Sequence, residues 1–135
     1  MKQLTGKIIF YRRPSIGTQV DIKPNQLFIL GNFLSSHLRS LSGLDFYVEI
    51  LKKNLEQYGV HEGCVASNTG EIHVTKTITK FAEDFFNENP EQDFYLETDL
   101  FFEIISLWRK FLTDKHLDSY IIDVEALRAM LIHKQ

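Results

Sequence analysis

The segment from Leu100 to Leu112 carries the strongest apolar stripe in the chain. Thr98 and Asp99 precede it, where an N-cap and a first-turn carboxylate of a helix belong. Its large apolar side chains recur at the spacing of one helix face: Leu100, Phe101, Ile104, Ile105, Trp108, Phe111 and Leu112. A helix with so wide an apolar face needs other elements to bury it, so the stripe predicts a helix at the core of a globular fold.

Two more segments predict helices. Ser42 to Asp45 fits a capping box, an apolar face follows it, and Gly59 stands where a left-handed C-terminal stop belongs. Asp123 can cap a last helix. A further element capped by Thr79 groups Phe81, Ala82, Phe85 and Phe86 on one face and ends before Pro90. Short apolar or alternating runs predict strands at 7–11, 19–22, 27–30, 64–66, 70–78, 93–97 and 117–122.

The 135 residues, 44% of them hydrophobic, suffice for one core. Strand and helix patterns mix without the regular alternation of a doubly wound parallel sheet. We therefore expect a single α+β domain over 1–135, a small antiparallel or mixed sheet packed with three or four helices. The longest apolar runs are far shorter than the ~20 residues that cross a bilayer, and Met1 to Phe10 lacks a signal-peptide pattern, so we expect a cytoplasmic protein without a membrane partner.

Negative charge is concentrated in one stretch. Between Glu83 and Trp108 the chain has eight carboxylates and no lysine or arginine: Glu83, Asp84, Glu88, Glu91, Asp93, Glu97, Asp99 and Glu103. Aromatic residues are interleaved with these acids. A solvated outer face of two helices is one explanation, and a docking face for a basic partner is the other. The net charge of −3 argues against direct binding to nucleic acid.

No pattern of a catalytic or metal site stands out, and we predict no catalytic residue, metal or cofactor. Two alternatives stay open: His73 with Glu71 could act in a small hydrolase, and the acidic cluster could hold a divalent cation. An exposed strand histidine and helix-capping acids are the structural explanations. Arg12 and Arg13 could touch a phosphate, but a solvent-facing turn is the favoured explanation of this pair.

The stretch from Phe94 to Leu112, Phe-Tyr-Leu-Glu-Thr-Asp-Leu-Phe-Phe-Glu-Ile-Ile-Ser-Leu-Trp-Arg-Lys-Phe-Leu, resembles a segment of bacterial immunity proteins of contact-dependent growth inhibition systems. The resemblance covers about 20 of the 135 residues. It implies a cytosolic antidote without enzymatic activity, which binds one cognate toxin domain. Such toxins are often nucleases that act on tRNA.

The leading hypothesis is therefore an immunity protein, monomeric or homodimeric, that neutralises a basic toxin domain. The residues assigned to partner binding follow from charge and aromaticity: Glu83, Asp84, Glu88, Glu91, Asp93, Tyr95, Glu97 and Asp99. A subunit that folds only within a homodimer is a third alternative, which an exposed patch around Trp108 or on the last helix would favour.

Overall fold

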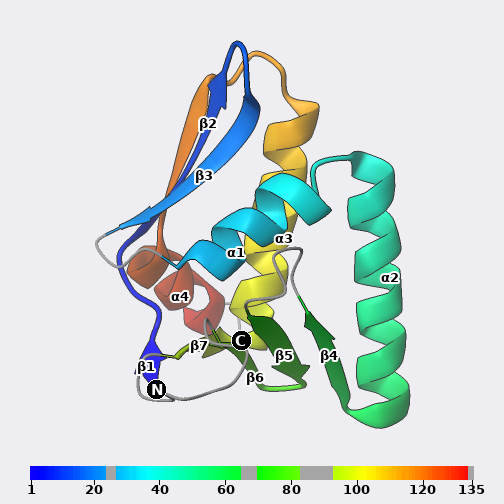
Figure 1. Cartoon of the computed structure of the whole chain (residues 1–135). Helices are drawn as coiled ribbons and strands as arrows, with labels where there is room; N and C mark the ends of the chain where they lie inside the picture. The colour runs from blue at the N-terminus through cyan, green and yellow to red at the C-terminus, as the bar shows by residue number, and fades with distance from the viewer. Residues whose placement is uncertain (24–26, 65–69, 83–92, 134–135) are drawn as a thin grey trace.

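A computed structural model describes residues 1–23, 27–64, 70–82 and 93–133. In this part the chain forms two β-sheets, four α-helices and one π-helical turn (Figure 1). The strands are β1 (Lys2–Gln3), β2 (Lys7–Arg13), β3 (Gly17–Lys23), β4 (Val60–Cys64), β5 (Glu71–Thr75), β6 (Ile78–Ala82), β7 (Phe94–Glu97) and β8 (Ser119–Asp123). The helices are α1 (Phe28–Asn32), the π-helical turn η1 (Phe33–His37), α2 (Leu41–Tyr58), α3 (Thr98–Thr113) and α4 (Val124–His133).

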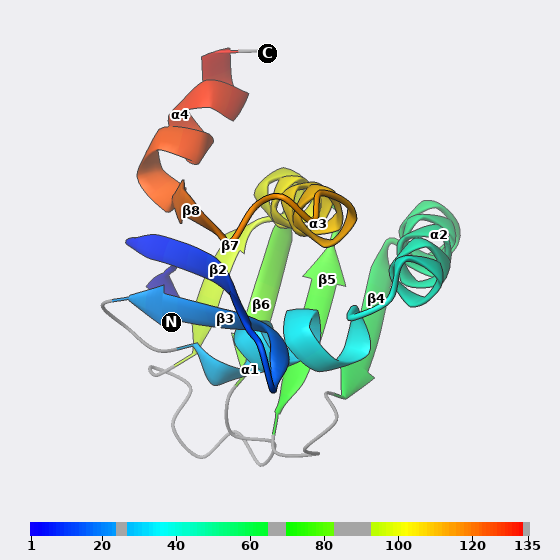
Figure 2. The ribbon, with the colours of Figure 1, turned by 90° about the horizontal axis from the view of Figure 1, so that it is seen from above.

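The larger sheet has the strand order β1-β7-β6-β5-β4. Its pairs are antiparallel except for β1 with β7, which is parallel. The smaller sheet, β3-β2-β8, is antiparallel throughout. Figure 2 shows α3 over the larger sheet and α2 beside its edge strand β4. The expected α+β fold is confirmed, with two sheets in place of the single one expected.

The core is centred on α3, as the apolar stripe predicts. Phe101, Trp108 and Phe111 are buried. The Trp108 ring meets Phe10 of β2 at 4.8 Å between centroids, and Phe101 meets Phe81 of β6 at 5.8 Å. The indole N–H of Trp108 donates to the carbonyl of Leu38 at 2.8 Å, so its polar atom is satisfied. The helix therefore ties the two sheets into one hydrophobic cluster.

Several local predictions are confirmed. Gly59 ends α2 with φ of 76°, in the left-handed region that glycine adopts without strain. The Asp123 carboxylate accepts from the Ala126 backbone N–H at 3.1 Å and so caps α4. The strands expected at 93–97 and 117–122 are β7 and β8. Of the run expected at 64–66, Cys64 is the last residue of β4, which pairs antiparallel with β5 as expected, and residues 65 and 66 lie outside the described part of the chain.

Two predicted elements are wrong. The run from Leu27 to Leu30 forms part of helix α1, because Leu27, Leu30 and Leu34 turn to the core at helical spacing. A short apolar run cannot by itself distinguish a buried strand from a buried helix. The stretch from Thr79 to Ala82 belongs to strand β6, which pairs with β5 and β7. The rest of that expected helix lies outside the described residues.

The helix starts also differ from the predicted caps. Ser40, and not Ser42, caps α2, since its hydroxyl accepts from the Gly43 N–H at 3.1 Å. For α3 the N-cap is Glu97. The Thr98 hydroxyl donates to the carbonyl of Thr75 at 2.7 Å and lies 3.0 Å from the hydroxyl of Thr79. Thr98 therefore joins α3 to the β5–β6 hairpin rather than capping its own helix.

Arg12 has a structural role that the sequence did not indicate. From strand β2 its guanidinium donates to the carbonyls of Phe111, Asp114 and Leu117, and it stacks over the Phe111 ring at 4.3 Å. The Phe111 carbonyl is among the last four of α3, which lack a partner within the helix, so Arg12 satisfies it from another element, and the Asp114 and Leu117 carbonyls belong to the segment that follows α3. Arg13 is exposed.

Candidate functional site

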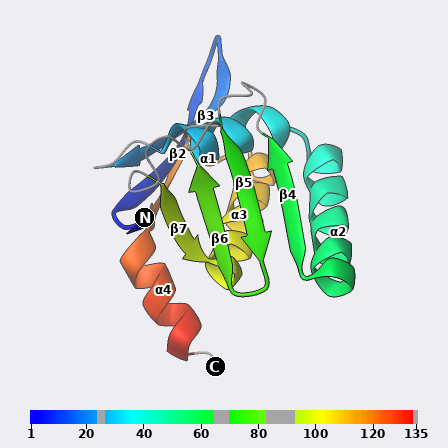
Figure 3. The ribbon, with the colours of Figure 1, turned by 60° about the horizontal axis from the view of Figure 1, so that its bottom comes forward.

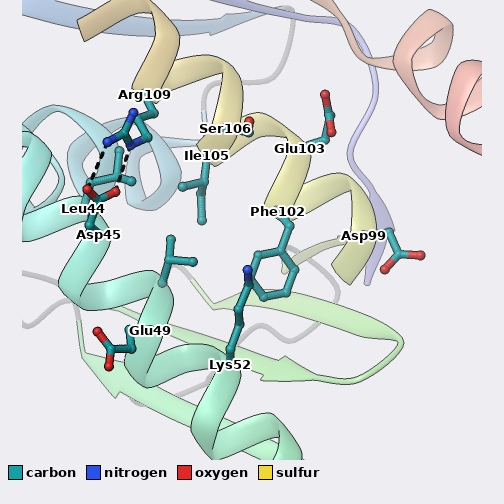
Figure 4. A pocket seen from close by; sticks show the side chains of 11 residues that line it. Leu44, Asp45, Glu49, Lys52, Asp99, Phe102, Glu103, Ile105, Ser106 and Arg109 are labelled. Carbon is teal, nitrogen blue, oxygen red and sulfur yellow. Dashed lines mark hydrogen bonds and ion pairs between the residues drawn. The ribbon is translucent and has the colours of Figure 1, made fainter. Parts of the chain in front are cut away.

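A groove of about 590 Å³ runs between α2 and α3 (Figure 4). Both helices pack on the larger sheet, and the side chains that face across from one to the other do not fill the space between them. The groove is lined from α2 by Leu44, Asp45, Val48, Glu49 and Lys52, and from α3 by Asp99, Phe102, Glu103, Ile105, Ser106 and Arg109. It is the candidate functional site because it combines apolar surface with unequal charge.

The floor of the groove is apolar. Phe102 and Ile105 point from α3 toward α2 in Figure 4. Ile105 is buried, while Val48 and Phe102 are half-buried and pack against the core from its edge. Lys52 lies with its ammonium 5.9 Å from the centroid of the Phe102 ring, so a cation already sits at this aromatic surface.

One end of the groove is closed by a bidentate ion pair. The Arg109 guanidinium donates to the two carboxylate oxygens of Asp45 at 2.8 and 3.0 Å. The hydrogen bond from Arg109 holds the pKa of Asp45 below its ordinary value, and the same bond raises the pKa of Arg109. Both side chains are exposed, so the pair contributes little to stability. It bridges α2 and α3 at this end of the groove.

The remaining charges on the rim are unequal. Asp99 and Glu103 lie along the outer side of α3 in Figure 4, and Glu49 lies on the α2 side. Lys52 is the basic residue on this part of the lining. Counting all lining residues, four carboxylates face two basic groups, a net charge of −2. The groove thus presents an apolar floor between carboxylate-bearing walls.

The structure places the predicted partner-binding residues in different environments. Glu83, Asp84, Glu88 and Glu91 lie outside the described residues. Asp99 is exposed and belongs to the groove.

Asp93 does not lie on an accessible face. It is 1% exposed, and its carboxylate stands 3.4 Å from the ammonium of Lys80. Tyr95 is half-buried and stands opposite Lys80 in the β6–β7 pairing. The assignment of Asp93 to a docking surface is corrected, because a buried carboxylate near the protein's own lysine cannot meet a partner.

Glu97 is also neutralised within the chain. Its carboxylate accepts from the guanidinium of Arg128 at 2.6 Å and from the Gln3 side-chain amide at 3.3 Å. Partial burial raises the pKa of Glu97, but the hydrogen bonds and the charge of Arg128 outweigh that effect and lower it. Glu97 therefore anchors α4 to β7, and we remove it from the docking surface.

His73 lies on the open face of the larger sheet. Its Nδ1 is 2.9 Å from a carboxylate oxygen of Glu62. Glu62 lies on the neighbouring strand β4 and is the register partner of His73. Lys80 follows in the same cross-strand row. Glu71, the partner suggested by sequence, is half-buried two residues away on the same strand. The carboxylate that orients His73 in this structure is therefore Glu62, which the sequence pattern did not suggest.

Within residues 1–23, 27–64, 70–82 and 93–133, no three His, Cys, Asp or Glu side chains come together as metal ligands would. None of the helices in these ranges combines the length and the apolar character needed to span a membrane.

Sequence reasoning missed the α2 half of the groove. The sequence pattern places Asp45 in a capping box and leaves Phe102 out of the apolar stripe of its helix. Nothing in a single sequence pairs Asp45 with Arg109, which lies 64 residues away. The apolar stripe and the acids of α3 were visible, but the surface that faces them depends on how α2 packs.

Comparisons with protein-family models, with curated proteins and with solved structures find no match to this chain.

Proposed function

We propose that this protein is an immunity protein, which binds and neutralises a cognate basic toxin domain of the nuclease type by docking it on the α2–α3 groove. The proposal makes it a cytoplasmic binding protein without catalytic chemistry or cofactor. The resemblance of the segment from Phe94 to Leu112 suggests this class, and α3 of the groove lies within that segment.

The observation that carries the proposal is the combination of an apolar floor with acidic rims. Half-buried Phe102 and Val48 offer surface that a partner can desolvate, and a few such anchors supply most of the binding energy of an interface. The carboxylates of Glu49, Asp99 and Glu103 lie at the rims of the groove, Glu49 on α2 and the other two along the outer side of α3. They would steer a positively charged partner toward it and raise the association rate.

The groove also defines the chemistry of the docked segment. An amphipathic segment with an apolar ridge flanked by lysine or arginine would place the ridge between α2 and α3 and its charges on the two rims. A nuclease domain carries such basic surfaces because it must bind phosphates. Covering them would block substrate binding.

The proposal predicts that a large secreted protein ending in a short basic domain is encoded immediately upstream, and the test measures association with that domain. Stopped-flow measurements of the association and dissociation rates at low and high salt separate long-range electrostatic steering from short-range contacts. The double variant Asp99→Lys with Glu103→Lys should slow association about tenfold at low salt and flatten its salt dependence. Phe102→Ala should mainly speed dissociation, since it removes an anchor.

Glu56→Lys is the matched control, because Glu56 is exposed on α2 but does not line the groove. It makes the same acid-to-lysine charge change as each single substitution of the double variant, and it should leave the association rate nearly unchanged. Failure of the wild-type protein to bind the toxin domain would refute the immunity function. Binding that ignores the groove variants would place the interface elsewhere.

A further inference from the structure

Helix α4 is apolar on nearly all of its sides. Its sequence from Val124 to His133 is Val-Glu-Ala-Leu-Arg-Ala-Met-Leu-Ile-His, in which only three residues are polar. A helix with this composition is normally enclosed by other elements.

The rest of the fold covers only one side of α4. Val124 and Leu127 are buried, and Arg128 binds Glu97 and the carbonyl of Leu4. The opposite side, which holds Ala126, Ala129, Met130 and His133, is exposed, and Met130 is 53% exposed. Figures 2 and 3 show α4 standing out from the body of the molecule. Ile121, at the end of β8 from which α4 starts, is 59% exposed.

We propose that this exposed side of α4 packs against α4 of a second copy of the chain, with the two helices antiparallel about a two-fold axis near Ala129. The direction follows from the fold. Packed helices lie 8–10 Å apart. Since α4 begins inside the body, a parallel pair would bring two bodies to the same end, where they would overlap. An antiparallel pair places them at opposite ends of a helix about 15 Å long.

The exposed side is complementary to itself in this arrangement. Centring the pair on Ala129 places Glu125 of each copy beside His133 of the other, so the two ends gain a carboxylate–imidazole contact. Glu125 also accepts from Arg128 at 2.7 Å, which orients its carboxylate at the start of the helix. Small Ala126 and Ala129 allow the backbones to approach closely, and Met130 can fill the space beside them.

The end of the second helix would also reach β8. In the antiparallel pair the C-terminal turn of one α4 lies beside the first turn of the other, which adjoins β8. Ile132 of one copy, 65% exposed in the monomer, can then approach exposed Ile121 of the other. The interface is small, so the dimer should be reversible and depend on concentration.

Sedimentation velocity from about 1 μM to about 1 mM tests the proposal. The wild-type protein should shift from monomer to dimer within this range. Ala129→Glu places two carboxylates at the axis and should weaken association at least about tenfold. Ser42→Glu, an equally exposed helical position on α2, is the matched control and should dimerise like the wild type. Circular dichroism verifies that each variant is folded.

Cysteine cross-linking tests the arrangement. In a Cys64→Ser background, Ala129→Cys should form a disulfide-linked dimer on mild oxidation. Glu125→Cys should not, because two copies of that position lie about 12 Å apart along the helix pair. A protein that stays monomeric throughout the concentration range overturns the proposal. So does a dimer that is indifferent to Ala129→Glu, or one that cross-links through position 125 instead of 129.

Discussion

The contact of Arg12 with the end of α3 gives the most direct test of how this fold is held together. The guanidinium donates to three carbonyls, those of Phe111, Asp114 and Leu117, and stacks on the Phe111 ring. Arg12→Met keeps the length and the apolar stem of the side chain but removes all of the donors. The smaller sheet then loses its polar connection to the central helix.

The expected cost follows from these contacts. Hydrogen bonds from a charged group contribute about 1.5–3 kcal/mol each when well shielded. This site is partly exposed, and water can replace some of the lost donors, so about 1 kcal/mol per bond is the appropriate value. The stacked cation adds about 0.5–1 kcal/mol. Arg12→Met should therefore lower the free energy of unfolding by about 3.5–4 kcal/mol, and the urea midpoint by about 2 M for a slope near 2 kcal/mol/M.

The assay is urea unfolding followed by tryptophan fluorescence. Trp108 is the single tryptophan of the chain and is 0% exposed against Phe111, so it reports directly on this region. Arg13→Met is the control. The neighbouring arginine is exposed, with its guanidinium 5.7 Å from the Tyr11 ring, and its loss should change stability by about 0.5 kcal/mol or less. Equal losses in the two variants would refute the structural role of Arg12.

Three further predictions concern single positions. Thr98→Val removes the hydroxyl that links Thr75 and Thr79 in the core, and it should lower the free energy of unfolding by about 1–3 kcal/mol. A urea midpoint equal to that of the wild type would contradict this role. Gly70→Ala would press a methyl group against the Ala82 carbonyl oxygen and the Ile29 side chain, so the thermal midpoint should fall. An unchanged midpoint would contradict this close approach. The pKa of Glu97 is lower in the folded protein than its ordinary value of 4.5. The ionised Glu97 carboxylate therefore contributes to stability above pH 4.5, and this contribution is lost as the pH falls through the folded pKa. Glu97→Gln should lower stability at neutral pH and make the urea midpoint less dependent on pH between about 5 and 3, and a parallel pH profile would contradict this.

Sequence patterns gave the elements whose signals are local. The apolar stripe of α3 specifies both a helix and its buried face, because seven large side chains at helical spacing leave few other ways to bury them. Gly59 and Asp123 act within one turn of their own helices, so their roles could be predicted from neighbouring residues alone. The same holds for the alternating strand β5.

Acidic composition was a weaker guide to the site. Asp93, Glu97 and Asp99 are close in sequence and carry the same charge, yet one is buried, one is bound by Arg128 and one lines the groove. A strand turns successive side chains to opposite faces, and the start of a helix changes the direction again, so adjacent acids need not share a surface.

By itself, the sequence determined that this protein is an α+β protein built around one aromatic helix, since periodicity and capping act over a few residues. Tertiary structure alone decided that the run from Leu27 to Leu30 became helical, that the segment from Thr79 to Ala82 joined a sheet, and that Asp45 faces Arg109 across the groove. Those outcomes depend on partners far away along the chain. Because a short segment has similar local preferences for several states, contacts with the rest of the fold select among them.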